Sequence, residues 1–472
     1  MTQSYDVRRS DWFIVELAIA SVCATRAVDK TFVTTTVVAC VISLLLILTI
    51  FIYHKRFLPL LLLIIVIISY LNGSKAMNEL HRVELGQYSG LARVISDPQR
   101  SGAATQIILD VSGDRFIVYA YGPPGWRLNS ANAGEQIFIT GQRSKLAPDQ
   151  AMRWVSRHVK GKLEIESVEE SRLIASPLFR GAQRVRKLID RGATSFPYDE
   201  RSLFTGLVIG DDSQQSKQMV TAFRKSGLAH LVAVSGQNVA FVLAGLSPLL
   251  RRLSKVLRLV VTCGILVWFV VITNIEPSVV RAAVMAGVAT LSISLGRPTR
   301  TLRLLAITVI ATIFFDPLLA WSVGYYMSVG ATAGLCVLSG PLSRSIPGPR
   351  WLALLIGTTI SAQIGVTPAV VFVFGFPAAI GIVANVLAVP VASLVMLVGL
   401  PLALLAGALN ETVLSWFGTL VMWPVFVGVR WVWWVAAICE RLSFTGIVNF
   451  GLWIAVLALI LSLLHRGARV EG

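Results

Sequence analysis

Polar side chains interrupt the apolar run Leu228–Leu250 in its first half. A histidine and a following serine could act as base and nucleophile, but their five-residue separation sets them about 140° apart on an ideal helix. A glycine directly after the serine predicts a break in the helix. Polar groups at membrane depth cost free energy unless they face protein or water. The run therefore favours a polar path over catalysis, with His230, Ser235, Gly236 and Asn238 as candidate lining residues.

Arg281 and Asn385 are polar anomalies of the same kind in later apolar runs. The arginine could screen the phosphates of a nucleic acid strand, or it could snorkel or pair with Glu276. The asparagine could line the same path or hydrogen-bond a neighbouring helix. Tyr325 and Gln363 are further candidates for the lining.

The composition places these residues in a membrane. The chain has 472 residues, of which 55% are hydrophobic and 14% charged, and its mean hydropathy is +0.71. Soluble domains are about a quarter charged. Apolar runs near the ~20 residues that span a bilayer predict a polytopic α-helical membrane protein with about 12 spans. The candidate spans are 12–28, 32–53, 57–72, 229–250, 257–274, 277–296, 302–316, 318–340, 351–374, 378–408, 412–438 and 447–465.

Glycines and prolines add two expectations to this helical pattern. The run 378–408 is too long for one simple span, and two glycines and two prolines punctuate it, so we expect a broken or re-entrant element. Gly330 and Gly334 form a GxxxG pattern, which predicts a close crossing between two helices.

The net charge of +17 is concentrated in short loops between the apolar runs. This pattern sets membrane orientation and predicts that both termini are cytoplasmic. Residues 73–200 then lie outside the cytoplasm.

The sequence pattern of the polar segment 73–170 predicts a small β-domain. Five strand-length segments are separated by turn signals, including Tyr121-Gly122-Pro123-Pro124-Gly125, which favours an OB-like barrel. Trp126 and Trp154 could stack on the bases of a single strand. The segment 82–170 has 11 Lys and Arg against 10 Asp and Glu, so ordinary barrel aromatics are the alternative. The strand segments are Leu91–Ile95, Thr105–Asp110, Arg115–Tyr121, Gln136–Thr140 and Gly161–Val168.

The segment 171–227 predicts two amphipathic interfacial helices, near 171–191 and 213–226. The first is strongly basic and includes Arg184, Arg186 and Lys187. It could lie on lipid headgroups, which we favour, or contact DNA phosphates. The chain thus divides into N-terminal helices (1–72), the barrel (73–170), the interfacial helices (171–227) and a transmembrane domain (228–472).

The sequence from Leu203, LFTGLVIGDDSQQSKQMVTAFRKSGLAHLVAVSGQNVAFVLA, resembles the competence domain of the ComEC family of DNA-uptake channels. Asn238 stands where that family usually has a second histidine. Asp211 could bind Mg²⁺, pair with a basic helix, or sit in a solvated turn or cap. The residues that match the family's pattern here are Gly210, Asp211, Gly227, Leu228, His230, Leu231, Ser235 and Gly236.

Four later segments resemble the same family in the same order. They are EPSVVRAAVM (276–285), DPLLAWSVGYYMSVGATAGL (316–335), SAQIGVTPAVVFVFG (361–375) and VANVLAVPV (383–391). The resemblance implies a channel that imports single-stranded DNA across the bacterial cytoplasmic membrane during natural transformation. It also implies an extracytoplasmic DNA receptor and a cytosolic DNA helicase as partners.

The family's C-terminal metallo-β-lactamase-like nuclease domain is not expected here, because the 5 histidines are far apart and offer no metal cluster. We therefore expect no enzyme activity, metal or cofactor, and a separate nuclease as a possible partner. A secondary transporter or permease of a small solute is the main alternative, because broken helices are typical of transporters. An intramembrane hydrolase is the least favoured alternative.

Overall fold

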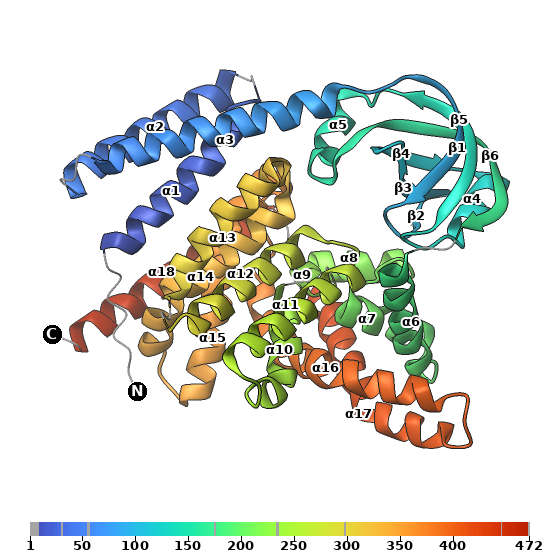
Figure 1. Ribbon diagram of the computed structural model, residues 1–472. Coiled ribbons are helices and arrows are strands. Elements are labelled where there is room, and N and C mark those ends of the chain that lie inside the picture. The colour runs from blue at the N-terminus through green and yellow to red at the C-terminus, as the bar shows by residue number, and fades with distance from the viewer. Residues whose placement is uncertain are drawn as a thin grey trace. The chain divides into compact units, whose positions relative to one another are not determined.

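The computed structural model describes residues 9–29, 32–53, 57–173, 176–232, 236–296, 299–444 and 446–470. The chain is mostly helical, with one small β-domain (Figure 1). It divides into two compact units. The first comprises Met1–Arg180 and Val288–Tyr325, and the second comprises Gly181–Gly287 and Tyr326–Gly472.

Helices α1 (Arg9–Arg26), α2 (Phe32–Tyr53), α3 (Phe57–His81) and α13 (Thr301–Phe315) form the helical part of the first unit. Glu16, which interrupts the first apolar run, is buried and accepts a hydrogen bond from Thr49 Oγ1 at 3.0 Å. Asp11 is also buried, and its carboxylate binds the guanidinium of Arg303. The two buried acidic side chains of α1 are therefore satisfied inside the protein, as buried polar groups require.

The β-domain is a closed barrel of five strands, β1 (Gly86–Val94), β3 (Ala104–Val111), β4 (Asp114–Ala120), β5 (Gln136–Ser144) and β6 (Val159–Leu173). Their order is β1-β5-β6-β4-β3, and β1 closes the ring by pairing with β3. The β4–β6 pair is parallel and the other pairs are antiparallel. The five predicted strands are confirmed, and this order is the one that an OB-like barrel has.

Two features of the barrel differ from the expected pattern. A short strand β2 (Gln99–Ser101) pairs with β3 and was not predicted. The segment from Tyr121, expected to be a turn, begins helix α4 (Gly122–Asn129), with prolines at its first positions, where a missing N–H does no harm. Leu128 of α4 is fully buried in the barrel core with Phe116 and Ile139. Two further short helices, α5 (Pro148–Trp154) and η1 (Val155–Arg157), precede β6.

Twelve helices of the described chain lie wholly or mostly in the second unit. They are α6 (Pro177–Gly192), α7 (Tyr198–Ile209), α8 (Lys217–Lys225), α9 (Ala229–Val232), α10 (Gly236–Leu250), α11 (Lys255–Ile272), α12 (Pro277–Ser294), α14 (Val323–Ser345), α15 (Arg350–Phe374), α16 (Gly381–Leu409), α17 (Ser415–Arg441) and α18 (Gly446–Val470).

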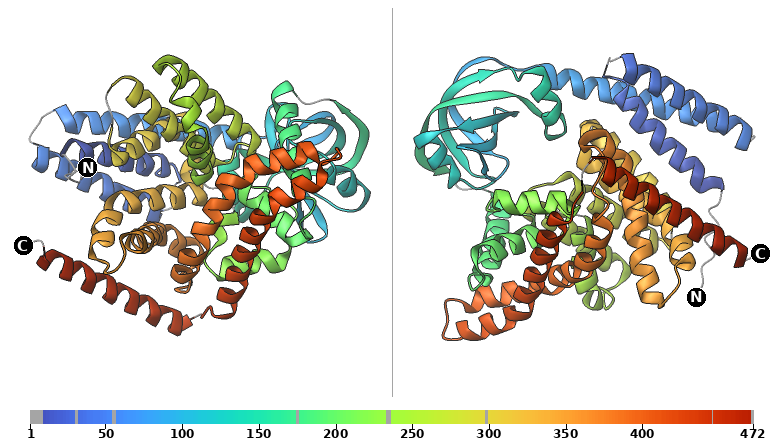
Figure 2. Two further views of the ribbon diagram at one scale, coloured as in Figure 1. Left: turned by 90° about the horizontal axis from the view of Figure 1, so that it is seen from below. Right: turned by 180° about the vertical axis from the view of Figure 1, so that it is seen from behind.

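Helix α16 is one continuous helix of 29 residues, with Pro390 and Pro401 inside it. The expectation of a broken or re-entrant element at 378–408 is therefore wrong. Ala384, Ala388 and Ala392 recur every four residues and are fully buried. Helix α17 runs closely beside α16, as Figure 2 shows, with its Gly428 against Val391 and Val395 of α16, and this packing supports α16 despite its prolines.

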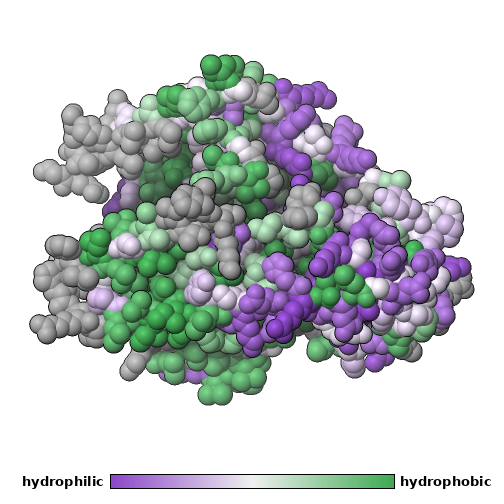
Figure 3. All heavy atoms as spheres, turned by 90° about the horizontal axis from the view of Figure 1, so that it is seen from above, coloured by the Kyte–Doolittle hydropathy of each residue, from purple (hydrophilic) through white to green (hydrophobic). Residues whose placement is uncertain are grey.

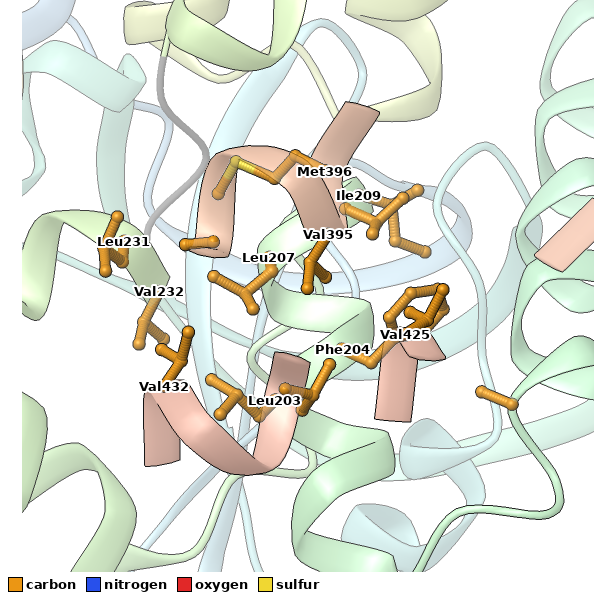
Figure 4. Packing of buried hydrophobic residues seen from close by; sticks show 14 of the residues in the cluster. Leu203, Phe204, Leu207, Ile209, Leu231, Val232, Val395, Met396, Val425 and Val432 are labelled. Atoms are coloured by element: carbon orange, nitrogen blue, oxygen red, sulfur yellow. The ribbon is translucent and has the colours of Figure 1, made fainter. Parts of the chain in front are cut away.

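The core of the second unit surrounds α7, from which Leu203, Phe204 and Leu207 are fully buried (Figure 4). Side chains of α16 and α17, including Val395 and Val425, pack against them. Helix α7 is thus apolar on nearly all sides and central to the unit. Such a helix is fixed by its surroundings rather than by one amphipathic face.

Each of the twelve predicted spans overlaps a helix of the structure. Among the described residues, six helices are long and apolar enough to cross a membrane. Large apolar side chains are exposed along them, and Figure 3 shows apolar residues over much of the visible surface. The six segments are Leu58–His81, Lys255–Ile272, Val323–Ser345, Arg350–Val373, Gly381–Leu409 and Ser415–Arg441.

Candidate functional site

Arg281 is buried at a junction of three helices of the second unit. Only 5% of the residue is exposed, and its Nε and Nη2 donate to Ser328 Oγ of α14 at 3.0 and 2.6 Å. A Cβ atom on Gly236 of α10 would lie 3.1 Å from Arg281 Nη2 and 2.8 Å from Ala282 Cβ. The glycine therefore lets the guanidinium lie directly beside the start of α10. Two sequence candidates, Gly236 and Arg281, are in contact, and the snorkelling interpretation does not fit so deep a burial.

Asn238 lies two residues further along α10 and is 3% exposed. Its Nδ2 donates to the carbonyl oxygen of Leu207 in α7 at 3.0 Å. Its Oδ1 is buried and has no hydrogen-bond partner among the described residues. The side chain that replaces the family's histidine therefore ties α10 to the central helix α7.

Asn385 and Gln363 both lie near Gly381, the first residue of α16. The Asn385 Nδ2 donates to Gly381 O of its own helix at 2.6 Å, so the expected bond to a neighbouring helix is not what satisfies this amide. A Cβ on Gly381 would lie 4.0 Å from Gln363 Nε2 of α15. Gly227 has a positive φ of 76°, and a Cβ there would be 2.9 Å from Gly381 Cα. The two glycines thus allow the turn before α9 to touch α16.

Gly210 and Asp211 form the turn after α7. Gly210 takes the left-handed conformation, with φ of 73°, and ends the helix. The Asp211 carboxylate lies 3.4 Å from Arg186 Nη2 of α6, and Arg186 Nη1 also donates to Asn274 Oδ1 at 3.3 Å. Two of the roles considered for Asp211 are present in the structure, because its carboxylate pairs with the basic helix and its Oδ1 also accepts a hydrogen bond from Ser213 N at 3.2 Å within the turn. This cluster joins α6, the α7–α8 turn and the α11–α12 turn.

The Arg186–Asp211 pair supports a stability prediction. Asp211→Asn should lower the free energy of unfolding by about 1 kcal/mol, because the pair is partly exposed. Thermal unfolding of the detergent-solubilised protein measures this change, and the double variant with Arg186→Gln should show less than the sum of the single losses. Strictly additive losses would contradict the pairing. Stabilisation by added Mg²⁺ that Asp211→Asn abolishes would instead support a metal site.

The apolar faces of the two predicted interfacial helices are buried in protein. Ile189 of α6 and Met219 and Phe223 of α8 belong to the core of the second unit. Phe223 stacks on Trp433 of α17, with ring centroids 6.2 Å apart. The patterns are amphipathic because α6 and α8 cover a protein core. Arg184 and Lys187 remain exposed on the polar face of α6 and are available to headgroups or phosphates.

Trp126 and Trp154 lie at opposite ends of the barrel. Trp126 follows the end of β4 and Trp154 precedes the start of β6, and these two strands are parallel. Trp126 is 75% exposed, whereas Trp154 packs beside Ile108 and Ile117. The two rings therefore do not make one stacking surface, and Trp126 is the exposed candidate.

The remaining sequence candidates are His230, Ser235 and Tyr325. His230 is exposed on the short helix α9, and Ser235 lies outside the described residues. Tyr325 belongs to the first unit, where it is fully buried and its hydroxyl lies 2.6 Å from Thr312 Oγ1. Packing accounts for this tyrosine.

The glycines of α14 and α15 form the close crossing that the GxxxG pattern predicts. A Cβ on Gly330 would lie 2.3 Å from Gly365 O, and one on Gly334 would lie 2.1 Å from Ser361 O. The backbones of α14 and α15 are therefore in direct contact over two helical turns. This contact fixes α14, which carries Ser328, against α15, which carries Gln363.

Among the interhelical contacts that sequence reasoning missed, two involve unusual polar residues of apolar helices. Gln237 Nε2 donates to Ser393 Oγ of α16 at 3.2 Å. Arg430 of α17 lies 3.8 Å from the buried Glu200 of α7. The contact between Arg430 and Glu200 could have been suspected from the sequence, because Arg430 is a single arginine inside the apolar run 412–438.

Comparison with known proteins bears on this arrangement. A family model described as "Competence protein" matches residues 207–470, more than half of the chain. The chain belongs to the competence protein family. The match includes the Arg281 junction, the Gly227–Gly381 contact and the α14–α15 crossing. The resemblance to the ComEC family is confirmed.

A curated competence-family relative is ComE operon protein 3 of Bacillus subtilis (strain 168). It is 27% identical over 233 residues, which are 48% of this chain and 30% of the relative. The chain thus covers less than a third of that relative's length. No solved structure matches the chain. Family membership and the six apolar helices together make this a helical membrane protein.

Proposed function

We propose that this protein forms a channel that imports single-stranded DNA across the bacterial cytoplasmic membrane during natural transformation. The observation that carries the proposal is the buried Arg281 guanidinium, held by Ser328 beside Gly236. A cation kept inside a helical membrane protein is costly and marks a pathway or site for a charged solute. Membership in the competence family makes a DNA phosphate the best candidate for that charge.

The proposal includes an orientation and partners. Both termini are cytoplasmic, and the barrel faces outward, where Trp126 is exposed to stack on a base. The strand is delivered by an extracytoplasmic DNA receptor and pulled by a cytosolic DNA helicase. A separate nuclease removes the other strand. The exposed Arg184 and Lys187 of α6 contact lipid headgroups beside the path.

The alternatives lose support. The transporter hypothesis rested on a broken helix at 378–408, and α16 is continuous. The hydrolase hypothesis needed a Ser235–His230 pair, and the five-residue separation sets these side chains about 140° apart on an ideal helix. The channel remains the function that the residues support best.

Deletion of the gene tests the channel. Labelled duplex DNA should still bind the cell surface, but the fraction that becomes resistant to external nuclease inside the cytosol should fall to background. Complementation with the intact gene is the control. Undiminished import by the deletion strain would refute the proposal.

A further inference from the structure

Arg430 is a charged residue near the middle of a helix that is apolar enough to span a membrane. It is the sixteenth of the 27 residues of α17. Its side chain is 47% exposed and lies 3.8 Å from the Glu200 carboxylate, which is only 10% exposed. In this ion pair the arginine side chain is therefore accessible from outside the protein, whereas the glutamate side chain is nearly buried.

Two aromatic rings flank the Arg430 guanidinium along α17. Its Cζ lies 5.8 Å from the Phe426 centroid and 5.6 Å from the Trp434 centroid. These residues stand four positions before and four after the arginine, so the three side chains share one side of the helix. Trp434 is 53% exposed, and Trp423 and Val427 are exposed further toward the start of the same helix. We refer to Phe426, Arg430 and Trp434 as the aromatic–arginine stripe.

Lipid is a poor occupant for this face. A half-exposed guanidinium in the hydrocarbon core costs several kcal/mol, and charges at that depth face protein or water. At 1.5 Å per residue, Arg430 lies about 16 Å from the nearer end of α17, well below lipid headgroups. The opposite face of α17 is already covered, because Met422, Val429 and Val432 are buried against the core. The open face therefore meets water or a polar solute.

We propose that the aromatic–arginine stripe is a contact surface for the transported single strand, an inference that rests on the channel function. An exposed indole offers a stacking surface that accepts any base, and the guanidinium beside it neutralises a phosphate. Such contacts are tolerant of sequence, which a strand in transit requires. Glu200 is a positioning residue that holds the guanidinium between the rings and balances its charge when no strand is present.

Photo-crosslinking of a stalled strand tests this contact in cells that produce the full chain. The probe is duplex DNA with 5-iodouracil in one strand and a streptavidin block at the trailing end. Crosslinks should map to residues 423–434, and Trp434→Leu should lower their yield about tenfold, as expected for one lost stacking contact. Trp416→Leu is the matched control, because Trp416 is 63% exposed on the same helix, about 21 Å from Arg430.

Import assays distinguish a role of Arg430 in contacting the strand from a purely structural role. Arg430→Gln should reduce import about tenfold at unchanged membrane abundance. If abundance falls, the double variant Glu200→Gln/Arg430→Gln removes both charges and restores it. Import that stays low in the double variant supports strand contact, whereas import that recovers with abundance overturns it.

Two other outcomes also overturn the stripe. One is normal import by Arg430→Gln and Trp434→Leu with crosslinks elsewhere in the chain, which leaves the channel function intact. The other is crosslinking of residues 423–434 to a photoreactive phospholipid that transported DNA does not displace. Failure of the channel function itself is recognised separately, by import in the deletion strain and by the lack of any strand crosslink to the chain.

Discussion

Replacement of Arg281 by alanine should reduce DNA import at least tenfold while the protein remains in the membrane at normal amounts. A charge-assisted hydrogen bond to a phosphate contributes about 1.5–3 kcal/mol, so its loss is large for a strand that must pass this residue. Stability should change less, because the substitution removes a costly buried charge together with its bonds to Ser328. Import of labelled DNA and immunoblotting of membranes measure the two quantities.

Arg281→Lys provides the matched control. Lysine keeps the charge but lacks the planar fork with which Arg281 holds Ser328 Oγ through two nitrogens. Its import should fall between that of the wild type and that of the alanine variant. If Arg281→Ala lowers abundance and import in proportion, the guanidinium is a packing element and the path does not run past it.

Gly365→Ala should severely destabilise the second unit. The added Cβ would lie 2.1 Å from Gly330 O, and neither backbone can move without separating α14 from α15. Overpacking of a close-packed interior costs about 1–3 kcal/mol and sometimes more. The melting temperature in detergent and the fraction of folded protein in membranes should both fall.

Gly264→Ala is the control for helix propensity. No described heavy atom lies within 4 Å of a Cβ placed on Gly264 of α11. That substitution should be neutral or stabilise the helix by up to about 1 kcal/mol. Equal losses for Gly264→Ala and Gly365→Ala would show that the α14–α15 crossing is not a tight backbone contact.

The sequence predicted the elements better than their pairing. Hydropathy located the long apolar helices, because a span must be long and apolar, but it did not locate the shorter central helix α7, and alternation located five barrel strands. The parallel β4–β6 pair could not be predicted, because it joins segments on either side of β5 and depends on closure of the barrel. Strand β2 has only three residues and carries no periodicity.

Two errors have local physical causes. Pro123 and Pro124 indicated a turn, but prolines also begin helices, and buried Leu128 selected the helix α4. Pro390 and Pro401 indicated a broken helix at 378–408, but α16 is continuous and packs closely against α17.

The sequence predicted which residues belong to the candidate site, but not which of them contact one another. Arg186 and Asp211 were singled out for separate reasons, and only the tertiary structure places them 3.4 Å apart. Gly236 was expected to interrupt a helix, and the structure shows that it also admits the Arg281 guanidinium. Single-sequence patterns show which residues are unusual for their environment, but they do not show which unusual residues meet.

The first and last strands of the barrel, β1 and β6, run in the same direction, which has a mechanical consequence. Strand β1 runs antiparallel to β5, and β5 runs antiparallel to β6, so β1 and β6 point the same way. The chain therefore comes into the barrel at one end and leaves from the other. The barrel is therefore connected in series between α3 and α6. A pulling force between these two helices would be carried by the hydrogen bonds between the barrel strands. A linker that replaces the barrel would have to be long enough to span the distance between the two ends at which the chain enters and leaves it.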